Sequence, residues 1–248
     1  MSPILPSLWY FLAGIGIAIL INALAEDLPR RIRPRLPHCP HCDQPYAPAR
    51  WLALTRRGVP CSQCGQPPPR RPIIVEAVTP LLFAALPWLV PHPVTRLFTA
   101  LYCAVLILII VIDLEHFLVL HIVTLPTTLL ALLASTIIPD QNWRLALAGA
   151  GSGFLLFFLF YWVGQLLFGA GALGFGDVTL SLMLGAMLGF DRIFFALLLG
   201  ILLGGVSSLV FIGLRRRVHF HIPYGPYLAV AGILMLIWGR QVFLWYTS

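Results

Sequence analysis

Long apolar stretches alternate with shorter polar segments along most of the chain. Apolar stretches of about 17 to 25 residues cross a lipid bilayer as helices. The pattern therefore predicts an all-α polytopic membrane protein with about eight transmembrane helices. The predicted spans cover residues 4–25, 73–90, 97–112, 119–138, 144–168, 173–190, 193–214 and 226–245.

One polar segment, residues 26–72, is much longer than the others and is rich in proline, arginine and cysteine. We therefore expect three parts: a first transmembrane helix at 1–25, a small loop domain at 26–72, and a multi-span helical domain at 73–248. The first apolar stretch has no positive residue before it and no polar cleavage region after it. It is predicted to be a retained helix rather than a signal peptide.

The composition excludes a water-soluble protein. Hydrophobic residues make up 59% of the 248 residues, charged residues make up only 10%, and the mean hydropathy is +0.91. Soluble domains average about 25% charged residues. A chain this apolar requires the lipid bilayer as its solvent.

The net charge of +7 comes from arginine, which supplies all 16 basic residues. Nine arginines lie in residues 26–72 and three more, Arg215 to Arg217, precede the last span, whereas the opposite face collects four. Basic residues accumulate in cytoplasmic loops, so residues 26–72 are predicted to be cytoplasmic and both termini to lie outside. Because the arginines flank apolar stretches and leave no soluble basic surface, we expect no nucleic-acid binding.

Four of the five cysteines form two pairs with the spacing of a zinc site. Cys39-x2-Cys42 is followed after 18 residues by Cys61-x2-Cys64, and each pair lies in a turn-rich context. Two such knuckles direct four thiolates at one ion, and the metal supplies folding energy to a loop with little core. Two disulfides are disfavoured, because disulfides rarely persist in the reducing cytoplasm. The remaining alternatives are redox-active dithiols and incidental cysteines. The prediction is a small cytoplasmic zinc-knuckle-like domain.

Three of the nine acidic residues lie at membrane depth: Asp113, Glu115 and Asp177. An ionisable side chain in the bilayer costs about 2.5–3.5 kcal/mol or more and is by default a functional candidate. The alternatives are that each is an interfacial acid that touches water, and that Asp177 simply caps its helix. Five further acids are expected to be solvated in loops or at span ends: Glu26, Asp27, Asp43, Asp140 and Asp191.

Asp113 and Asp177 are stronger candidates as a pair than singly. The predicted topology places Asp113 at the cytoplasmic end of the third span and Asp177 at the cytoplasmic start of the sixth. Two carboxylates held close together cannot both ionise easily, so one keeps a proton while the other accepts one. Such a pair can activate water for attack on a peptide carbonyl.

Glycines occur beside Asp177 and at four-residue spacing within several spans. Gly174 and Gly176 remove side chains next to the acid, so that extended substrate backbone could approach it; alternatively, they only break the preceding loop. The spaced glycines let helix backbones pack closely in lipid and carry no functional prediction. They are Gly149 and Gly153, Gly185 and Gly189, and Gly200 and Gly204.

A set of motifs follows in order along most of the chain. It consists of the four-cysteine loop, Arg71-Pro72-Ile73-Ile74-Val75-Glu76, Asp113-Leu114-Glu115-His116, Gly174-Phe175-Gly176-Asp177, and Ile222-Pro223-Tyr224-Gly225-Pro226-Tyr227. This ordered set resembles the prepilin peptidases, also called type IV leader peptidases, a family of GxGD aspartic peptidases. They are bifunctional enzymes of the bacterial inner membrane that cleave a leader and N-methylate the new N-terminus.

The resemblance implies that Asp113 and Asp177 are the catalytic pair of a peptidase domain at 73–248. It implies a type IV prepilin or pseudopilin as substrate and partner, cut after a glycine at the cytoplasmic edge of its apolar helix. It also implies methylation of the new amine with S-adenosylmethionine. The substrate would serve either a pilus or a secretion apparatus.

The first span departs from the family pattern. Where the family shows Gly-Ser-Phe-Leu-Asn, this chain has Ala18-Ile19-Leu20-Ile21-Asn22. After the first acid, Val119-Leu120-His121 replaces the usual Ile-Pro-Asp or Ile-Pro-Asn step. Asn22 and Glu76 are the candidates for binding S-adenosylmethionine, with a structural role as the alternative for each.

Two other functions would use the same residues. A proton- or ion-coupled transporter would carry its charge on Asp113 and Asp177, and broken helices at the midplane in paired halves would favour it. Here the acids fall at span ends, and the sequence shows no halved symmetry. A membrane thiol oxidoreductase would use the cysteine pairs, and bound zinc without a redox-active dithiol would exclude it.

Overall fold

The structure is a computed structural model that describes residues 3–30, 35–139, 141–169, 173–215 and 223–247. Within these ranges it contains eight α-helices, two short 3-10 helices and no β-strand. This confirms the predicted all-α class. Some residues used above lie outside the described ranges: Ile222 of the last motif, Asp140, and the arginines Arg31, Arg33, Arg216 and Arg217.

Six of the eight helices described are long and apolar enough to cross a membrane. They are α1 (Ile4–Asp27), α2 (Arg71–Leu89), α3 (Pro93–His116), α5 (Trp143–Phe168), α7 (Phe190–Arg215) and α8 (Gly225–Thr247). The other two, α4 (His121–Ala134) and α6 (Phe175–Leu188), have 14 residues each. At 1.5 Å per residue they are about 21 Å long, which is less than the ~30 Å hydrocarbon core of a bilayer.

The two short helices begin or end inside the predicted spans 119–138 and 173–190. The backbone at Leu120 is extended, so α4 begins only at His121, and a turn follows Ala134. Gly189 has a φ of +78° and ends α6, because a left-handed glycine is the usual stop for a helix.

The chain forms two compact units, residues 1–91 and 92–248, so that α2 groups with α1. In the first unit, α1 and α2 pack against each other in antiparallel directions. Gly14 allows this contact, because a Cβ there would lie 2.7 Å from the Cα atom of Pro80. Near the end of α2, Trp88 donates a hydrogen bond from Nε1 to Oγ of Ser7, near the start of α1, at 3.0 Å.

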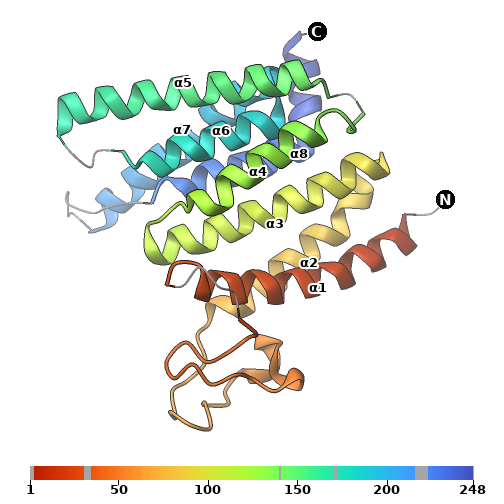
Figure 1. Ribbon diagram of the computed structural model, residues 1–248, viewed down its shortest axis with the longest axis vertical. Coiled ribbons are helices and arrows are strands. Elements are labelled where there is room, and N and C mark those ends of the chain that lie inside the picture. Colours follow the sequence, from red (N-terminus) through yellow and green to blue (C-terminus); the bar gives the residue numbers. More distant parts are fainter. Residues whose placement is uncertain (1–2, 31–34, 140, 170–172, 216–222, 248) are drawn as a thin grey trace. The chain divides into compact units, whose positions relative to one another are not determined.

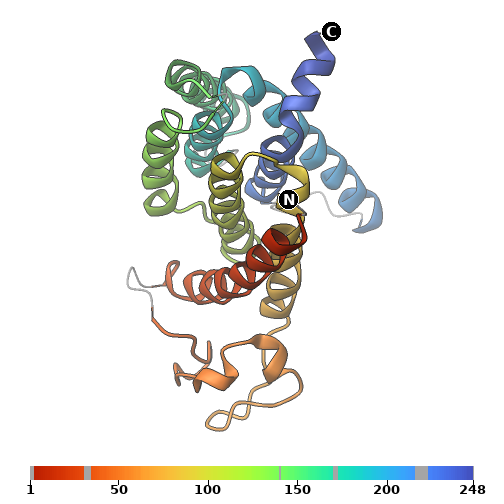
Figure 2. The ribbon, with the colours of Figure 1, turned by 90° about the vertical axis from the view of Figure 1, so that its right-hand side faces the viewer.

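The polar segment between α1 and α2 forms a small lobe, which we call the cysteine lobe (described residues 35–70). It contains the 3-10 helices η1 (Pro48–Arg50) and η2 (Ala53–Arg56) and is otherwise made of turns and loops. Figure 2 shows it at one end of the α1–α2 pair.

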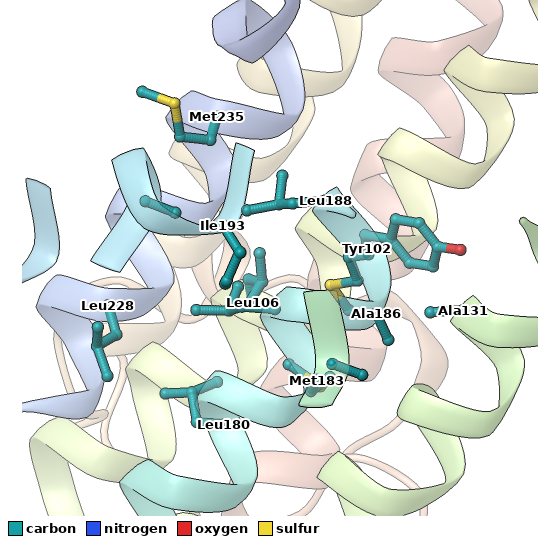
Figure 3. Packing of buried hydrophobic residues seen from close by; sticks show 14 of the residues in the cluster. Tyr102, Leu106, Ala131, Leu180, Met183, Ala186, Leu188, Ile193, Leu228 and Met235 are labelled. Carbon is teal, nitrogen blue, oxygen red and sulfur yellow. The ribbon is translucent and has the colours of Figure 1, made fainter. Parts of the chain in front are cut away.

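Helix α6 is the centre of the second unit. From Asp177 to Leu188 every residue except Leu182 is buried, and α4, α5, α7 and α8 all pack against it (Figure 1). Figure 3 shows Met183 of α6 among apolar side chains from the neighbouring helices. Because protein rather than lipid surrounds α6, its polar helix ends can find partners inside the bundle.

Glycines set the spacing between α5 and α6. A Cβ atom on Gly149 would lie 2.5 Å from the carbonyl oxygen of Gly185, and one on Gly153 would lie 2.5 Å from that of Ser181. The hydroxyl of Ser181 donates a hydrogen bond to the carbonyl oxygen of Gly153 at 3.0 Å. These contacts confirm the predicted close packing of the two helices.

Two further glycines of the predicted pairs act in the same way on α7. A Cβ on Gly200 would lie 2.7 Å from Leu228, and one on Gly204 would lie 2.8 Å from the ring of Tyr224. Gly189 differs, since a Cβ there would make only ordinary contacts with Leu145. Its role is to end α6.

Replacing Gly185 with alanine should lower the free energy of unfolding by roughly 1–3 kcal/mol, because the added methyl group overlaps the backbone of Gly149 and forces the helices apart. Thermal unfolding of the purified protein in detergent measures this. The matched control is Gly151→Ala on α5, where a Cβ would meet nothing within 4 Å. Equal stability of the two variants would contradict the packing described here.

Candidate active site and metal centre

Asp113 lies in the last turn of α3, where the helix ends sharply. Phe117 adopts a left-handed φ of +56° and donates its backbone N–H to the carbonyl oxygen of Asp113 at 2.9 Å. Asp113 is only 4% exposed. Its carboxylate accepts a hydrogen bond from the backbone N–H of Gly225. The acid is therefore held between the end of α3 and the start of α8.

Gly225 can approach Asp113 only because it has no side chain. A Cβ atom there would lie 2.5 Å from Oδ2 of Asp113 and 3.3 Å from Cγ2 of Val119. Sequence reasoning missed both Gly225 and Val119 as site residues. The available signal was the glycine between Tyr224 and Pro226, which marks a close backbone approach at the start of the last span.

Asp177 lies in the first turn of α6, which begins directly after Gly174. Its carboxylate accepts a hydrogen bond from the backbone N–H of Gly174, as the acidic residue of a capping box does. Asp177 is 8% exposed. The carboxylate therefore stabilises the helix start, and this structural role exists beside any chemical one.

The structure brings Asp113 and Asp177 together. Their carboxylates are close enough to interact electrostatically, and Tyr224 also interacts with Asp177. Glu115, the third acid expected at membrane depth, is exposed on α3. Two neighbouring buried carboxylates can share one proton, so one can act as an acid and the other as a base.

The two glycines before Asp177 have different surroundings. A Cβ on Gly176 would lie 2.7 Å from the Cβ of Val119, so the space beside this glycine is filled by the segment that joins α3 to α4. A Cβ on Gly174 would make only an ordinary contact, 3.6 Å from Oδ2 of Asp177. The space beside Gly174 is more open than the space beside Gly176. Approach of a substrate backbone to Asp177 stays a prediction, and these surroundings favour it at Gly174.

Polar side chains of α4 hold the first turn of α6. Nδ1 of His121 lies 3.2 Å from the hydroxyl of Thr179, and Thr124 donates a hydrogen bond to the same hydroxyl at 3.4 Å. Thr179 in turn donates to the carbonyl oxygen of Gly176 at 2.9 Å. The ring of His121 also packs edge-on against Phe175. These contacts fix the turn that carries Asp177.

The four predicted metal ligands converge in the cysteine lobe. The sulfur atoms of Cys39, Cys42, Cys61 and Cys64 all lie within 4.8 Å of one another. The Cys39–Cys64 and Cys42–Cys61 sulfur distances are 3.8 and 3.7 Å. A tetrahedron with zinc–sulfur bonds of about 2.3 Å has edges of about 3.8 Å, so the sulfurs already have the spacing of a four-cysteine zinc site.

The two knuckles are built alike. In the first, Asp43 donates its backbone N–H to the carbonyl oxygen of Cys39 at 2.9 Å; in the second, Gly65 donates to that of Cys61 at 2.9 Å. Asp43 and Gly65 both have a positive φ, of 59° and 67°. Each turn thus points two cysteines the same way.

The thiols need a cation to ionise together. Backbone N–H groups of Cys64 and Gln63 lower the pKa of Cys61 to about 6. The N–H of Gln44 lowers the pKa of Cys42, but desolvation and the neighbouring thiols raise it to about 12. A bound divalent metal keeps such thiolates deprotonated. The donor set therefore fits a structural zinc ion with no open coordination position.

Glu76 joins the cysteine lobe to α2. Its carboxylate accepts the backbone N–H of Ala53 at 2.7 and 2.8 Å and that of Leu54 at 3.2 Å, at the start of η2. It also accepts a hydrogen bond from Nδ2 of Asn22 at 3.4 Å. These contacts occupy both carboxylate oxygens with the protein's own donors.

Asn22, the other predicted cofactor residue, contacts Glu76 and donates from Nδ2 to the carbonyl oxygen of Pro72 at 3.2 Å. Its Oδ1 atom is buried without a hydrogen-bond partner among the described residues. Around these two residues the fit to S-adenosylmethionine is thus partial: Asn22 offers one free acceptor, and Glu76 offers none.

The expectation that the acids at span ends are solvated is wrong for Asp27, which is 1% exposed. Its carboxylate accepts the backbone N–H of Arg35 at 2.6 Å and the guanidinium of the same residue at 3.3 Å. Nε2 of His38 lies 3.7 Å away. A buried charge requires such partners, and they come from the chain that follows α1.

Purified protein should contain about one zinc ion per chain, and Cys42→Ala should lose it, because structural sites need four ligands. Elemental mass spectrometry measures the metal. Cys103→Ala is the matched control, since Cys103 is buried in α3 and should leave the zinc content unchanged. Zinc-free protein with an oxidisable cysteine pair would support the oxidoreductase alternative instead.

Glu76→Ala should loosen the cysteine lobe, because it leaves the backbone N–H groups of Ala53 and Leu54 without their acceptor, at a cost of about 1–3 kcal/mol. Limited digestion with trypsin should then cut the arginine-rich lobe several times faster. Glu115→Gln, at an exposed position of α3, is the control. Unchanged digestion of Glu76→Ala would show that this residue does not hold the lobe.

Comparison with known proteins finds relatives along most of the chain. The profile of the type IV leader peptidase family matches residues 100–209, which include Asp113 and Asp177. The prepilin leader peptidase/N-methyltransferase of Aeromonas hydrophila is 34% identical over 217 residues, covering 85% of this chain and 74% of the relative. Its namesake in Stutzerimonas stutzeri is 31% identical over 216 residues, covering 84% and 74%.

No solved structure matches the chain. The identity and coverage of the relatives, together with six apolar helices among the residues described, indicate a multi-pass protein of the inner membrane. The chain belongs to the type IV leader peptidase family.

Proposed function

We propose that this protein is a prepilin leader peptidase in which Asp113 and Asp177 are the catalytic pair. The observation that carries the proposal is the meeting of two buried carboxylates at the end of α3 and the start of α6. Both lie in the region that matches the family. The proposed peptidase domain is the multi-span part of the chain, residues 73–248.

The proposed reaction is hydrolysis by an activated water molecule. One carboxylate removes a proton from water, whose oxygen bonds to the carbonyl carbon of the scissile peptide. The other, protonated, carboxyl group stabilises the carbonyl oxygen and then supplies a proton to the departing amine as the C–N bond breaks. The pair returns to its starting state with one shared proton.

The proposed substrate is a type IV prepilin or pseudopilin, cut on the cytoplasmic side. Support comes from the names of the relatives, which are prepilin leader peptidases. The arginine distribution favours a cytoplasmic location for the cysteine lobe and for the helix ends that carry both acids. A substrate with an apolar helix can enter from the bilayer and present its polar leader at that face.

We also propose N-methylation of the newly exposed amine, because the relatives carry that activity in their names. S-adenosylmethionine would supply the methyl group. Of the two predicted cofactor residues we retain Asn22, whose buried Oδ1 can accept a hydrogen bond from a ligand. Glu76 is assigned instead to holding the cysteine lobe, since its oxygens are already engaged.

Asp113→Asn and Asp177→Asn should each reduce leader cleavage by roughly 10³-fold or more, because the loss of either carboxyl group removes the acid–base pair. Purified protein is incubated with a prepilin, and mass spectrometry measures the mature product. With S-adenosylmethionine present, the wild-type product should gain one methyl group.

Glu115→Gln is the control and should cleave normally, since Glu115 is exposed rather than buried. The inserted amount and the unfolding temperature of each variant are measured in parallel, so that a folding defect is not mistaken for lost chemistry. Cleavage that persists in either asparagine variant would refute the assigned pair. Proton uptake by reconstituted vesicles without any cleavage would instead support the transporter alternative.

A further inference from the structure

A cleft lies where the cysteine lobe meets the start of α2. It lies beside the turn after η2, the second cysteine knuckle and the first turn of α2. Its polar lining includes the side chains of Arg57 and Arg70, and its apolar lining includes Ile73 and Ile74. Both arginines are exposed. The cleft thus combines two cations with apolar surface.

The positive charge of this cleft is not neutralised by the lobe. None of the described residues that line the cleft is acidic. Elsewhere in this unit Glu26 pairs with Arg71, and Asp27 and Asp43 pair with Arg35. The carboxylate of Glu76 is held by the backbone N–H groups of Ala53 and Leu54. Among the described residues, neither cleft arginine forms an ion pair. Two unpaired guanidinium groups at one cleft attract an anion, and phosphate is a group that arginine binds well.

The N-terminus of α2 adds to this attraction. The helix begins at Arg71, directly beside the cleft, and no side chain caps it. Pro72 has no N–H, and the N–H of Ile73 is bonded to the carbonyl oxygen of Arg70 at 3.2 Å. The helix start therefore contributes the partial positive charge of its dipole, which favours a phosphate nearby. The helix start and the two arginines therefore act in the same direction.

The apolar side of the cleft continues along α2 into its membrane-spanning part. Ile74 is 62% exposed, and Val78 and Leu81 follow at 51% and 64%. Residues at this spacing share one face of a helix. The opposite face packs against α1 with Val75, Thr79 and Phe83 buried. A molecule that joins a phosphate to a long hydrocarbon chain would match both surfaces.

We propose that this cleft binds an anionic phospholipid, with its phosphate between Arg57 and Arg70 and an acyl chain along Ile74, Val78 and Leu81. The apolar face of α2 favours a lipid over a free phosphate, which would leave that face unused. Binding would fix the position of the cysteine lobe at the membrane surface. This inference is independent of the proposed peptidase chemistry.

The experiment uses the full-length protein with its metal in detergent micelles and titrates phosphatidylglycerol, phosphatidylcholine or inorganic phosphate. Native mass spectrometry counts bound lipid, and thermal unfolding reports stabilisation. The wild type should bind phosphatidylglycerol in preference to phosphatidylcholine. Arg57→Gln combined with Arg70→Gln should weaken phosphatidylglycerol binding by roughly tenfold to thirtyfold, because each arginine near an anionic lipid surface contributes about fivefold.

The matched control carries Arg50→Gln and Arg144→Gln, which remove the same charge away from the cleft. It should bind phosphatidylglycerol like the wild type. Ile74→Asn should weaken the binding of phosphatidylglycerol. It should leave any thermal stabilisation by inorganic phosphate unchanged. Zinc content and unfolding in phosphatidylcholine show that each variant is folded.

Three results would overturn the proposal. Equal loss of binding in the control would show attraction to overall charge rather than a site. Equal stabilisation by inorganic phosphate would show an anion site without a lipid. Equal binding of the two phospholipids would show that the arginines do not select the headgroup.

Discussion

Two carboxylates can stay buried in an apolar helix bundle only if the protein supplies donors to them. Here both donors are backbone N–H groups at helix starts. Gly225 begins α8 and donates to Asp113, while Gly174 precedes α6 and donates to Asp177. The partial positive charge at each helix start offsets the negative charge facing it. The position of the acid pair therefore depends on where these two helices begin.

Close backbone contacts fix the position of the acid pair. Helix α6 is wrapped by four other helices, and its distance from α5 is set by glycines whose missing side chains leave room for carbonyl oxygens. Val119 lies against Gly176 and close to Gly225. One side chain therefore touches the starts of both α6 and α8, beside the N–H groups that donate to the two acids. A contact between His121 and Thr179 and a hydrogen bond from Thr124 to Thr179 hold the same turn. Few rearrangements could move one acid without moving the other.

Much of this arrangement was predictable from local patterns. Apolar length located the helices, and the paired cysteine spacing located the four-cysteine cluster, because both signals reside within a short stretch of chain. The scarcity of acids singled out Asp113 and Asp177. Their meeting depends on the packing of distant helices. The predicted topology placed them on one face of the membrane, and the resemblance to a known family implied that they form a pair.

What could not be predicted arises from contacts between distant segments. Gly225 has no apparent role until α8 is placed against the end of α3. The burial of Asp27 depends on Arg35 and His38 folding back after α1. For Glu76 the sequence left open a cofactor role and a structural one, because no local pattern shows that its carboxylate contacts the start of η2. Helix α4 is short because the backbone at Leu120 is extended, and α6 is short because Gly189 ends it with a positive φ. Neither residue interrupts the hydrophobic pattern.

The order in which the chain is made gives the Asp113–Gly225 contact a further meaning. Both acids leave the ribosome before the segment that donates to the first of them, because that segment begins α8, which follows both acids in the chain. A nascent chain that stalls or is truncated before α8 carries both carboxylates without the finished geometry around them. The surroundings of Asp113 are therefore complete only once α8 has joined the bundle.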